Sequence, residues 1–355
     1  MAPINQIAHT LFSSVELTAN DVVICSEPNY AYKAHFQSLF TYSTETKKSW
    51  LSDLTGWRDD GAGLFDSAEN PALEWGSDKQ CLNSKLFRVL AHPCLDIFQS
   101  DRLLPNMVSL KLNFHRASND FCIMNVKAAN TTKYKIKVAQ AIFHLKRSVL
   151  TPETFMTIER NLGGGANLLY PVKSLVIKPS SIPQGATSKT IDTMFSNQYI
   201  PERLLITFVD QKAFTGNARK NPFNLQHFEI VDCSVELMGQ TYRQTFDWDT
   251  TSKTNGTIIP YRNYIKLLGQ KYPDDSGFGI SKYDYENGNF VMCFDLSPDE
   301  AFRTGNSAAG VKGNIVLNIT FNAPLGAPVI LLATGVYDNT FMTTVDRSFT
   351  RPFVY

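Results

Sequence analysis

The side chains that could do metal, acid–base or nucleophilic chemistry are scattered along this sequence. The six histidines are His9, His35, His92, His115, His144 and His227. None of them forms the H-x-H or H-E-x-x-H spacing by which two imidazoles bind one zinc ion. His115 and His144 fall on the polar side of predicted strands, where a solvated imidazole is the expected role. We therefore predict no metal site built on histidine.

The six cysteines are equally dispersed. They are Cys25, Cys81, Cys94, Cys122, Cys233 and Cys293. Zinc sites and secreted disulfide frameworks both need closer, patterned spacing, and no C-x-x-C pair occurs. The sequence therefore predicts buried free thiols in a reducing compartment.

Acidic residues and glycines give no stronger signal. Three carboxylate pairs have the chemistry for acid–base catalysis or calcium binding, namely Asp59/Asp60, Asp247/Asp249 and Asp274/Asp275. Each pair lies in a loop-like stretch, so we interpret all three as solvated turn residues. The glycines at 163–165 lack the lysine of a phosphate-binding loop, and no G-x-S-x-G motif is present. We predict no enzymatic activity, no catalytic residue, no cofactor and no metal ion.

Composition predicts a folded protein without targeting signals. Of the 355 residues, 43% are hydrophobic and 19% are charged, which allows a packed core for one or two domains. The net charge is +1 without a basic tail, so we expect no specific nucleic-acid binding. Residues 1–10 lack a signal peptide, and no apolar run approaches the roughly 20 residues that span a bilayer. We therefore expect synthesis in the cytosol, and we interpret the glycosylation sequons at Asn130, Asn255 and Asn318 as chance matches.

Several segments alternate apolar and polar residues with the period of a half-buried strand. The clearest are 108–115, 231–238 and 314–321, whose apolar sets are Val108, Leu110, Leu112 and Phe114; Val231, Cys233, Val235 and Leu237; and Ile315, Leu317, Ile319 and Phe321. Further strands are predicted at 12–18, 133–146, 172–178, 203–210, 290–296 and 328–336. Many strands joined by long loops with few helices indicate an all-β sandwich or jelly roll.

Two helices are predicted between the strands. Residues 31–41 carry an apolar stripe of Tyr32, Phe36, Leu39 and Phe40, which should lie on a sheet. Residues 152–161 follow Thr151 as N-cap and precede the glycines at 163–165. We interpret this second helix as a connector between two β-domains, with the boundary near residue 166.

Particular runs of sequence also follow a recognisable order. They are HTLFSSVEL at 9–17, YAYKAHFQSLFTYSTETKKSW at 30–50, FQSDRLLPNMVSLKLNFHRASNDFCIM at 98–124, the run Lys220-Asn221-Pro222-Phe223-Asn224 within 182–228, YDYENGNFVMCFDL at 283–296, GNIVLNITF at 313–321, and the segments 335–339 and 345–347. In this order, from about residue 9 to the C-terminus, they resemble the major capsid proteins of Polinton (Maverick) elements and adintoviruses.

The resemblance implies a double jelly-roll: a first roll at 1–166 that includes the connector helix, and a second roll at 167–355. It also implies homotrimers that form pseudo-hexagonal capsomers of an icosahedral capsid. The expected partners are other copies of the chain, neighbouring capsomers and a penton or minor capsid protein. The expected location is the virion, with synthesis in the host cytosol and assembly there or in the nucleus. Loops at 55–80, 211–226 and 240–282 are then candidates for towers and intersubunit contacts. Trp57, Trp75 and Trp248 are either interface anchors or core residues.

One departure from the family pattern carries an expectation of its own. Family members have several more strands before the segment that matches 9–17, so we expect the first roll to be incomplete and to leave strand edges unpaired. Eight paired strands in both rolls would refute this. Two other functions compete with the capsid hypothesis: a jelly-roll module that binds carbohydrate or a receptor, and a cupin-type metalloenzyme, which the dispersed histidines disfavour.

Overall fold

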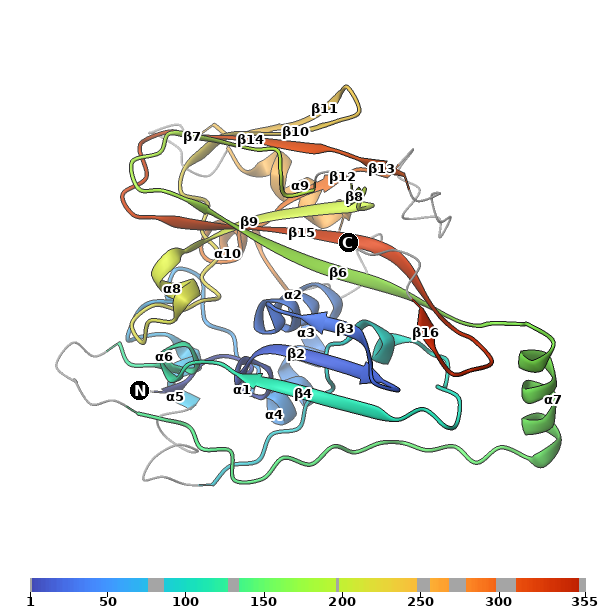
Figure 1. Ribbon diagram of the computed structural model, residues 1–355. Helices are drawn as coiled ribbons and strands as arrows, with labels where there is room; N and C mark the ends of the chain where they lie inside the picture. The colour runs from blue at the N-terminus through green and yellow to red at the C-terminus, as the bar shows by residue number, and fades with distance from the viewer. Residues whose placement is uncertain are drawn as a thin grey trace.

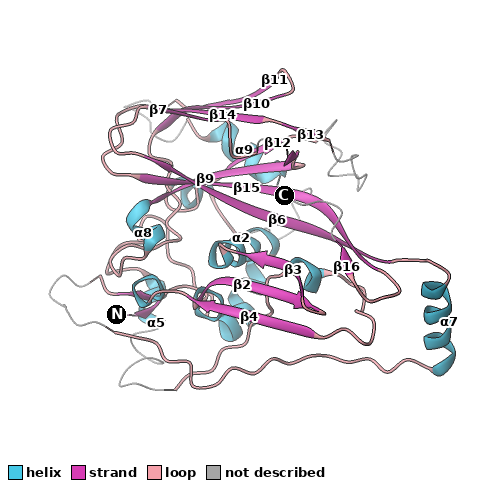
Figure 2. Ribbon diagram, in the orientation of Figure 1, coloured by secondary structure: helices cyan, strands magenta, loops and turns pink. Residues whose placement is uncertain are grey.

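The computed structural model describes residues 2–75, 86–126, 134–195, 198–247, 256–267, 279–297 and 311–350. Within these ranges the fold is built mainly of antiparallel β-sheets, with short helices in the connections (Figure 2). The strands gather in two bodies. One is formed by residues 2–126 and the other by residues 168–350 (Figure 1).

The second body consists of two facing sheets. One sheet has the order β11-β10-β14-β7, and the other has the order β12-β9-β15 with β6 on the far side of β15. The bounds are β6 (Leu168–Ile182), β7 (Ser188–Ile191), β9 (Arg203–Asp210), β10 (Ile230–Leu237), β11 (Gln240–Thr245), β12 (Met292–Asp295), β14 (Ile315–Phe321), β15 (Val329–Thr343) and β16 (Phe349–Thr350), which pairs with the end of β15. Eight strands that alternate between two sheets in this order form a complete jelly roll.

Alternating sequence explains the core of this roll. On β14, Ile315, Leu317, Ile319 and Phe321 are buried, as predicted for 314–321. Leu317 pairs with Val235 of β10 in the register, and Ile319 pairs with Cys233, so buried residues face buried residues across the ladder. The strands predicted at 172–178, 203–210, 290–296 and 328–336 correspond to β6, β9, β12 and β15.

The first body has fewer strands. Its main sheet has the order β3-β2-β4, formed by β2 (Phe12–Ala19), β3 (Val22–Glu27) and β4 (Leu110–Arg116). A separate pair joins β1 (Ala2–Pro3) to β5 (Ile123–Met124). The apolar residues of β4 are only half-buried, and Phe114 is 41% exposed. The predicted alternation is therefore present on β4, but little packs against its apolar face.

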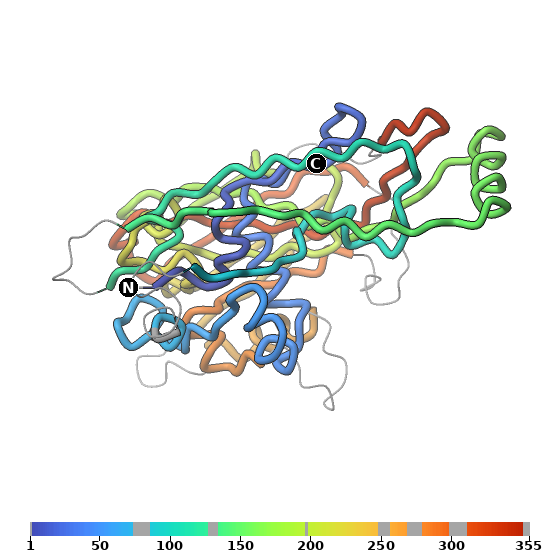
Figure 3. Tube along the Cα trace, turned by 90° about the horizontal axis from the view of Figure 1, so that it is seen from below, coloured from blue at the N-terminus to red at the C-terminus, as the bar shows by residue number. Residues whose placement is uncertain are grey.

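The strand predicted at 133–146 is wrong for the residues that the structure describes. Residues 134–150 run extended across the length of the molecule, without a ladder partner, to α7 (Pro152–Gly163) (Figure 3). Their apolar content satisfied the sequence pattern, but an extended segment becomes a strand only where another strand accepts its backbone hydrogen bonds. No such strand lies beside it in the described part of the chain.

The helices differ in what surrounds them. Helix α2 (Tyr30–Thr41) lies between β2 of the first body and β6 of the second (Figure 1). The apolar stripe predicted for it is buried, and so is its opposite face, because a sheet covers each side. The remaining short elements are α1 (Ile7–Thr10), α3 (Thr44–Thr46), η1 (Lys47–Leu51), α4 (Ser52–Thr55), α5 (Pro71–Trp75), η4 (Asp96–Gln99), α6 (Asn119–Cys122), β8 (Gln198–Tyr199), α8 (Gln211–Thr215), α9 (Ile258–Leu267), α10 (Lys282–Glu286) and β13 (Lys312–Gly313).

Helix α7 follows its sequence signals closely. The Thr151 side chain accepts a hydrogen bond from the Thr154 N–H, and Pro152 occupies the first turn. Gly165 ends the helix with φ +89°, a conformation that glycine adopts without strain. Only Leu162 of this helix is buried, and α7 lies at one end of the molecule, where Glu159 pairs with Arg347 of the second body (Figure 1). None of the described helices is long and apolar enough to cross a membrane.

Candidate functional site

The two bodies meet through aromatic side chains around α2. The ring of His35 stacks on Phe223 with centroids 4.1 Å apart and an angle of 10° between the planes. On its other side His35 stacks on Trp57 at 5.7 Å. Tyr32 packs edge-to-face against Phe223 and stacks on Phe214. A helix of the first body is thereby fixed to the loop before β10 of the second.

His35 is an uncharged part of this interface. Its side chain is buried, and neither ring nitrogen has a hydrogen-bond partner among the described residues. Burial lowers the pKa of His35 to about 3, and the positive charge of Lys47 contributes in the same direction. The imidazole therefore stays neutral at physiological pH and acts as a flat packing group.

A second contact between the bodies is polar and centres on Asp60. Its carboxylate accepts hydrogen bonds from the side-chain amides of Asn5, Asn70 and Asn221, each at 2.9 Å. Burial raises the pKa of Asp60 to about 6, although the three amide donors act to lower it. The expectation of a solvated turn residue is therefore wrong for Asp60, because the loop folds back into the interface. Asp59 is exposed, as expected.

The run at 220–224 supplies the contacts that the second body makes around Asp60 and Asp66. Asp66 accepts hydrogen bonds from the Asn221 N–H at 2.6 Å and from the Asn224 amide at 3.0 Å. The Asn221 side chain also accepts from the Phe223 N–H, which fixes the turn between them. We expected 211–226 to project outward as an intersubunit loop. Its C-terminal part is instead buried between the two bodies.

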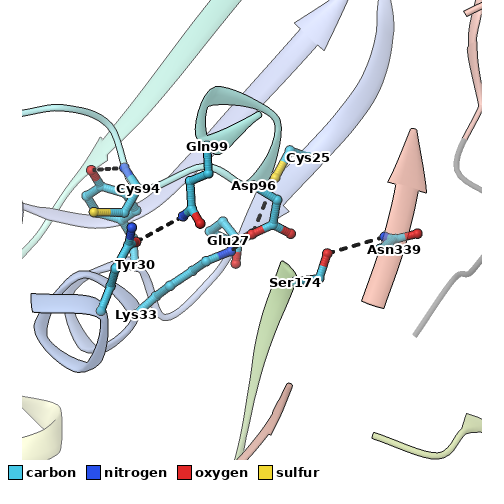
Figure 4. Close-up of polar contacts among 10 residues, drawn as sticks. Cys25, Glu27, Tyr30, Lys33, Cys94, Asp96, Gln99, Ser174 and Asn339 are labelled. Carbon is cyan, nitrogen blue, oxygen red and sulfur yellow. Dashed lines mark hydrogen bonds and ion pairs between the residues drawn. The ribbon is translucent and has the colours of Figure 1, made fainter. Parts of the chain in front are cut away.

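The most concentrated group of charges lies beside α2, inside the first body. Lys33 extends from the helix, and its Nζ contacts Oδ1 of Asp96 at 2.5 Å and the carboxylate of Glu27 (Figure 4). The exposed fractions are 2% for the Lys33 side chain, 1% for Asp96 and 13% for Glu27. We call these three residues the buried ion cluster. Such a cluster is unusual because charged groups are rarely buried unless they are paired.

The titration behaviour of the buried ion cluster follows from its unequal charges. Burial raises the pKa of Glu27, and the nearby Asp96 carboxylate raises it further, against the attraction of Lys33. Burial alone would lower the pKa of Lys33, but the two carboxylates offset this effect and raise it. One base therefore faces two acidic groups in a largely buried site, and the pKa values of both Glu27 and Lys33 are raised.

A thiol lies next to these carboxylates. Cys25 donates to Glu27 Oε1 at 3.3 Å, and burial, followed by the negative charge of Glu27, raises the pKa of the thiol well above its usual range. The thiol is therefore unreactive. The donor atoms of Cys25, Glu27 and Asp96 lie within 4.8 Å of one another, a spacing that would fit one metal ion. The Lys33 ammonium contacts two of these donors and supplies the positive charge that a metal would bring.

The other chemically capable residues stay apart. His115 and His144 are exposed, as predicted, while His9 is buried with its Nδ1 2.9 Å from the Tyr30 hydroxyl. Five cysteines are buried and free, and Cys81 lies outside the described residues. Trp57 is a core residue.

Three further expectations fall partly on residues that the structure does not describe. These are Trp248 and the side chain of Trp75, Asp249 with Asp274 and Asp275, and the sequons at Asn130 and Asn255. Asn318 is described: it lies on β14, accepts from Thr190 and donates to Glu236. Asp247 is exposed.

The sequence reasoning missed the buried ion cluster, although a signal for it was present. Lys33 is the one charged residue in the predicted helix at 31–41, and Asp96 stands between apolar neighbours in the run CLDIF. A charge embedded in an apolar stretch indicates either exposure or a buried partner. Only the fold brings residues 27, 33 and 96 together.

Among the described residues, a run of exposed apolar side chains lies on residues 134–150 and α7. Tyr134, Val138, Ile142, Leu145 and Val149 are among its exposed side chains, and Val149 is 98% exposed. Residues 134–150 carry four lysines and arginines and no acidic residue. Contiguous apolar surface of this kind usually marks a contact with another polypeptide.

Sequence comparisons find one curated relative of this chain. No family model matches the sequence. An uncharacterized protein of Caenorhabditis elegans is 26% identical over 302 residues, which cover 84% of this chain and 69% of that protein.

Similar solved structures include a protein of the Sputnik virophage, with a TM-score of 0.56 and coverage of 99% of this chain and 76% of that one. The capsid of PBCV-1 virus gives 0.52 with 99% and 86%, and the mavirus major capsid protein gives 0.51 with 100% and 79%. Identity is 12% in each case. These likenesses show that the chain has the double jelly-roll fold of viral major capsid proteins.

Proposed function

We propose that this chain is a structural capsid protein, of a virus or of an endogenous Polinton-like element, without enzymatic activity. The observation that carries the proposal is one of architecture. A complete eight-stranded roll is packed on a second β-body, and this pair of bodies aligns over 99% or more of the chain with viral capsid structures. The segment resemblance to Polinton and adintovirus capsid proteins supports the narrower assignment.

We divide the chain into a first roll at 1–166 and a second at 167–355. The strands of each half pair only with strands of the same half in the described residues, and α7 lies between them. In this proposal the functional unit is a homotrimer that forms a pseudo-hexagonal capsomer of the virion. Its further partners are neighbouring capsomers and a penton or minor capsid protein.

The oligomeric state tests this proposal. Light scattering and electron microscopy of the purified chain should show trimers with pseudo-hexagonal outlines. A population that stays monomeric throughout the micromolar range would contradict it. Two variants separate the surface of 134–150 and α7 from the rest of the molecule. Val149→Asp places a charge in this exposed apolar surface, and Met238→Asp, as the control, places the same charge at an exposed apolar position elsewhere.

We further propose that the first roll is incomplete within residues 1–355. Its sheet order β3-β2-β4 corresponds to β11-β10-β14 of the second roll, and the segment 134–150 follows β4 as β15 follows β14. The counterparts of β6, β7 and β9 are absent from the described residues of the first body. The four basic residues of 134–150 favour completing strands that carry acidic side chains.

A further inference from the structure

The buried ion cluster places an amine against a carboxyl group at ion-pair distance. Lys33 Nζ lies 2.5 Å from Asp96 Oδ1, and both side chains are almost completely buried. Glu27 contacts the same Nζ (Figure 4). An amine, a carboxyl group that can accept its attack and a second carboxyl group that can carry protons are the three parts that amide formation requires.

We propose that Lys33 and Asp96 condense to form an internal amide cross-link, with Glu27 as the catalytic residue that carries the protons. The product joins α2 covalently to η4, two elements that are 63 residues apart along the chain. The cross-link is a modification of the folded protein, because only the fold brings residues 27, 33 and 96 into contact. It does not depend on the proposed function.

The reaction balances without a cofactor or an oxidant. A proton moves from the Lys33 ammonium to the Asp96 carboxylate, which leaves a free amine and a neutral acid. The amine attacks Cγ of Asp96, the C–N bond forms, and the Cγ–O bond breaks. Glu27 takes the second proton from the nitrogen and delivers one to the departing oxygen, which leaves as water. Glu27 ends in its starting protonation state.

Burial affects this sequence through the close ion pair. Because the two carboxylates raise the pKa of Lys33, the neutral amine forms by proton transfer to the touching Asp96 carboxylate and not by loss of a proton to solvent. Burial raises the pKa of Glu27, so its protonated form is more accessible than that of a solvated carboxyl group. The product replaces two buried charges by one neutral amide, and exclusion of water slows the reverse hydrolysis.

The chain contains its own negative control. Lys173 contacts Asp338 Oδ1, also at 2.5 Å, and Glu202 lies 3.0 Å from the same amine. This second set has the same three residue types, but the Lys173 side chain is 50% exposed and Asp338 is 30% exposed. Solvent stabilises the charged forms there, so no amide should form. Burial, and not mere proximity, distinguishes the two sites.

Intact-mass spectrometry of the purified full chain tests the proposal. The wild-type protein should be lighter than its sequence by one water molecule, and peptide mapping should recover a branched peptide that contains Lys33 and Asp96. Glu27→Gln keeps the shape of the side chain but cannot shuttle protons, so it should retain the full mass, and Lys33→Met should do the same. The reaction of Lys33 with Asp96→Asn should release ammonia instead of water, because the departing group is then the amide nitrogen of the asparagine.

Each outcome decides the question. A branched peptide at 33/96 without one at 173/338 supports the proposal. A wild-type chain of full mass, with a native circular dichroism spectrum and separate peptides after prolonged incubation, overturns it and leaves a simple ion cluster. The wild-type result stands on its own even where a variant fails to fold. A variant Glu27→Gln that still loses water would remove Glu27 from the mechanism.

Discussion

At the scale of single residues, one histidine of the interface packs as an apolar aromatic ring would. His35 is stacked between Trp57 and Phe223 and makes no hydrogen bond through its ring to a described residue. It behaves as a small aromatic ring for as long as it is neutral. Protonation would place a charge in a buried site beside the positive charge of Lys47, which the folded state resists.

This burial predicts a pH-dependent stability. The pKa of His35 is about 3 in the folded state, against an ordinary value of 6.5. Below pH 6.5 the unfolded chain binds a proton that the folded chain does not, so stability is full above pH 6.5 and falls as the pH falls toward 3. At pH 5 the loss is about 2 kcal/mol from this residue. His9, with its pKa lowered to about 4 by burial and then by His92, acts in the same direction.

Denaturant unfolding at pH 7 and pH 5 measures the effect. The variant His35→Phe keeps an aromatic ring in the stack and should lose less stability on acidification, by about 2 kcal/mol. Asp60 acts in the opposite direction, because its raised pKa favours the folded state as the pH falls, but it is unchanged in both proteins. The exposed residue His144 provides the control: His144→Gln should keep the wild-type slope. An unchanged slope in His35→Phe would contradict the prediction.

At the scale of elements, sequence alternation predicted the longer strands of the sheets but missed the short strands β3, β7 and β11, of which β7 and β11 carry many polar residues. Strand β9 matches its predicted bounds of 203–210. Strand β15 runs beyond the predicted 328–336. The prediction stopped early because the polar pair Asp338 and Asn339 breaks the apolar pattern of the sequence. Asn339 is nevertheless buried and donates to Ser174 on β6. A hydrogen bond across the ladder thus satisfies a polar residue that the pattern excluded.

The segment 134–150 shows the opposite error, and it gives a prediction. Its apolar residues suit a strand, but its backbone lacks a ladder, apart from single contacts such as the Ile136 N–H to the Asn119 side chain. Hydrogen exchange followed by mass spectrometry should find its amides exchanging fast, while β15, its counterpart in the second roll, stays protected. Strands that complete the first roll would slow the exchange of 134–150. Equal protection of the two segments in the isolated chain would show that a partner strand is already present.

At the scale of the whole molecule, sequence could predict the fold class but not the joint between the halves. Alternating strands and the capped helix α7 follow from local pattern and chemistry. The partners of Asp60 come from residues 5, 70 and 221, and no local pattern connects such distant positions. The resemblance singled out 220–224 as distinctive, and the structure gives a physical reason: these residues connect the two bodies.

That joint should make the two bodies unfold together. Replacing Asp60 by Ala leaves three buried amides without their acceptor, which should lower the free energy of unfolding by about 3 kcal/mol. Because the amides belong to both bodies, exchange should rise in β2 and in β10 alike, and thermal unfolding should remain a single transition at a lower midpoint. The neighbouring Asp59→Ala removes an exposed carboxylate and should change stability by less than about 0.5 kcal/mol. If Asp60→Ala loosens only β2, the bodies are independent domains that touch without coupling, and the stacking of Phe223 on His35 contributes little to holding them together.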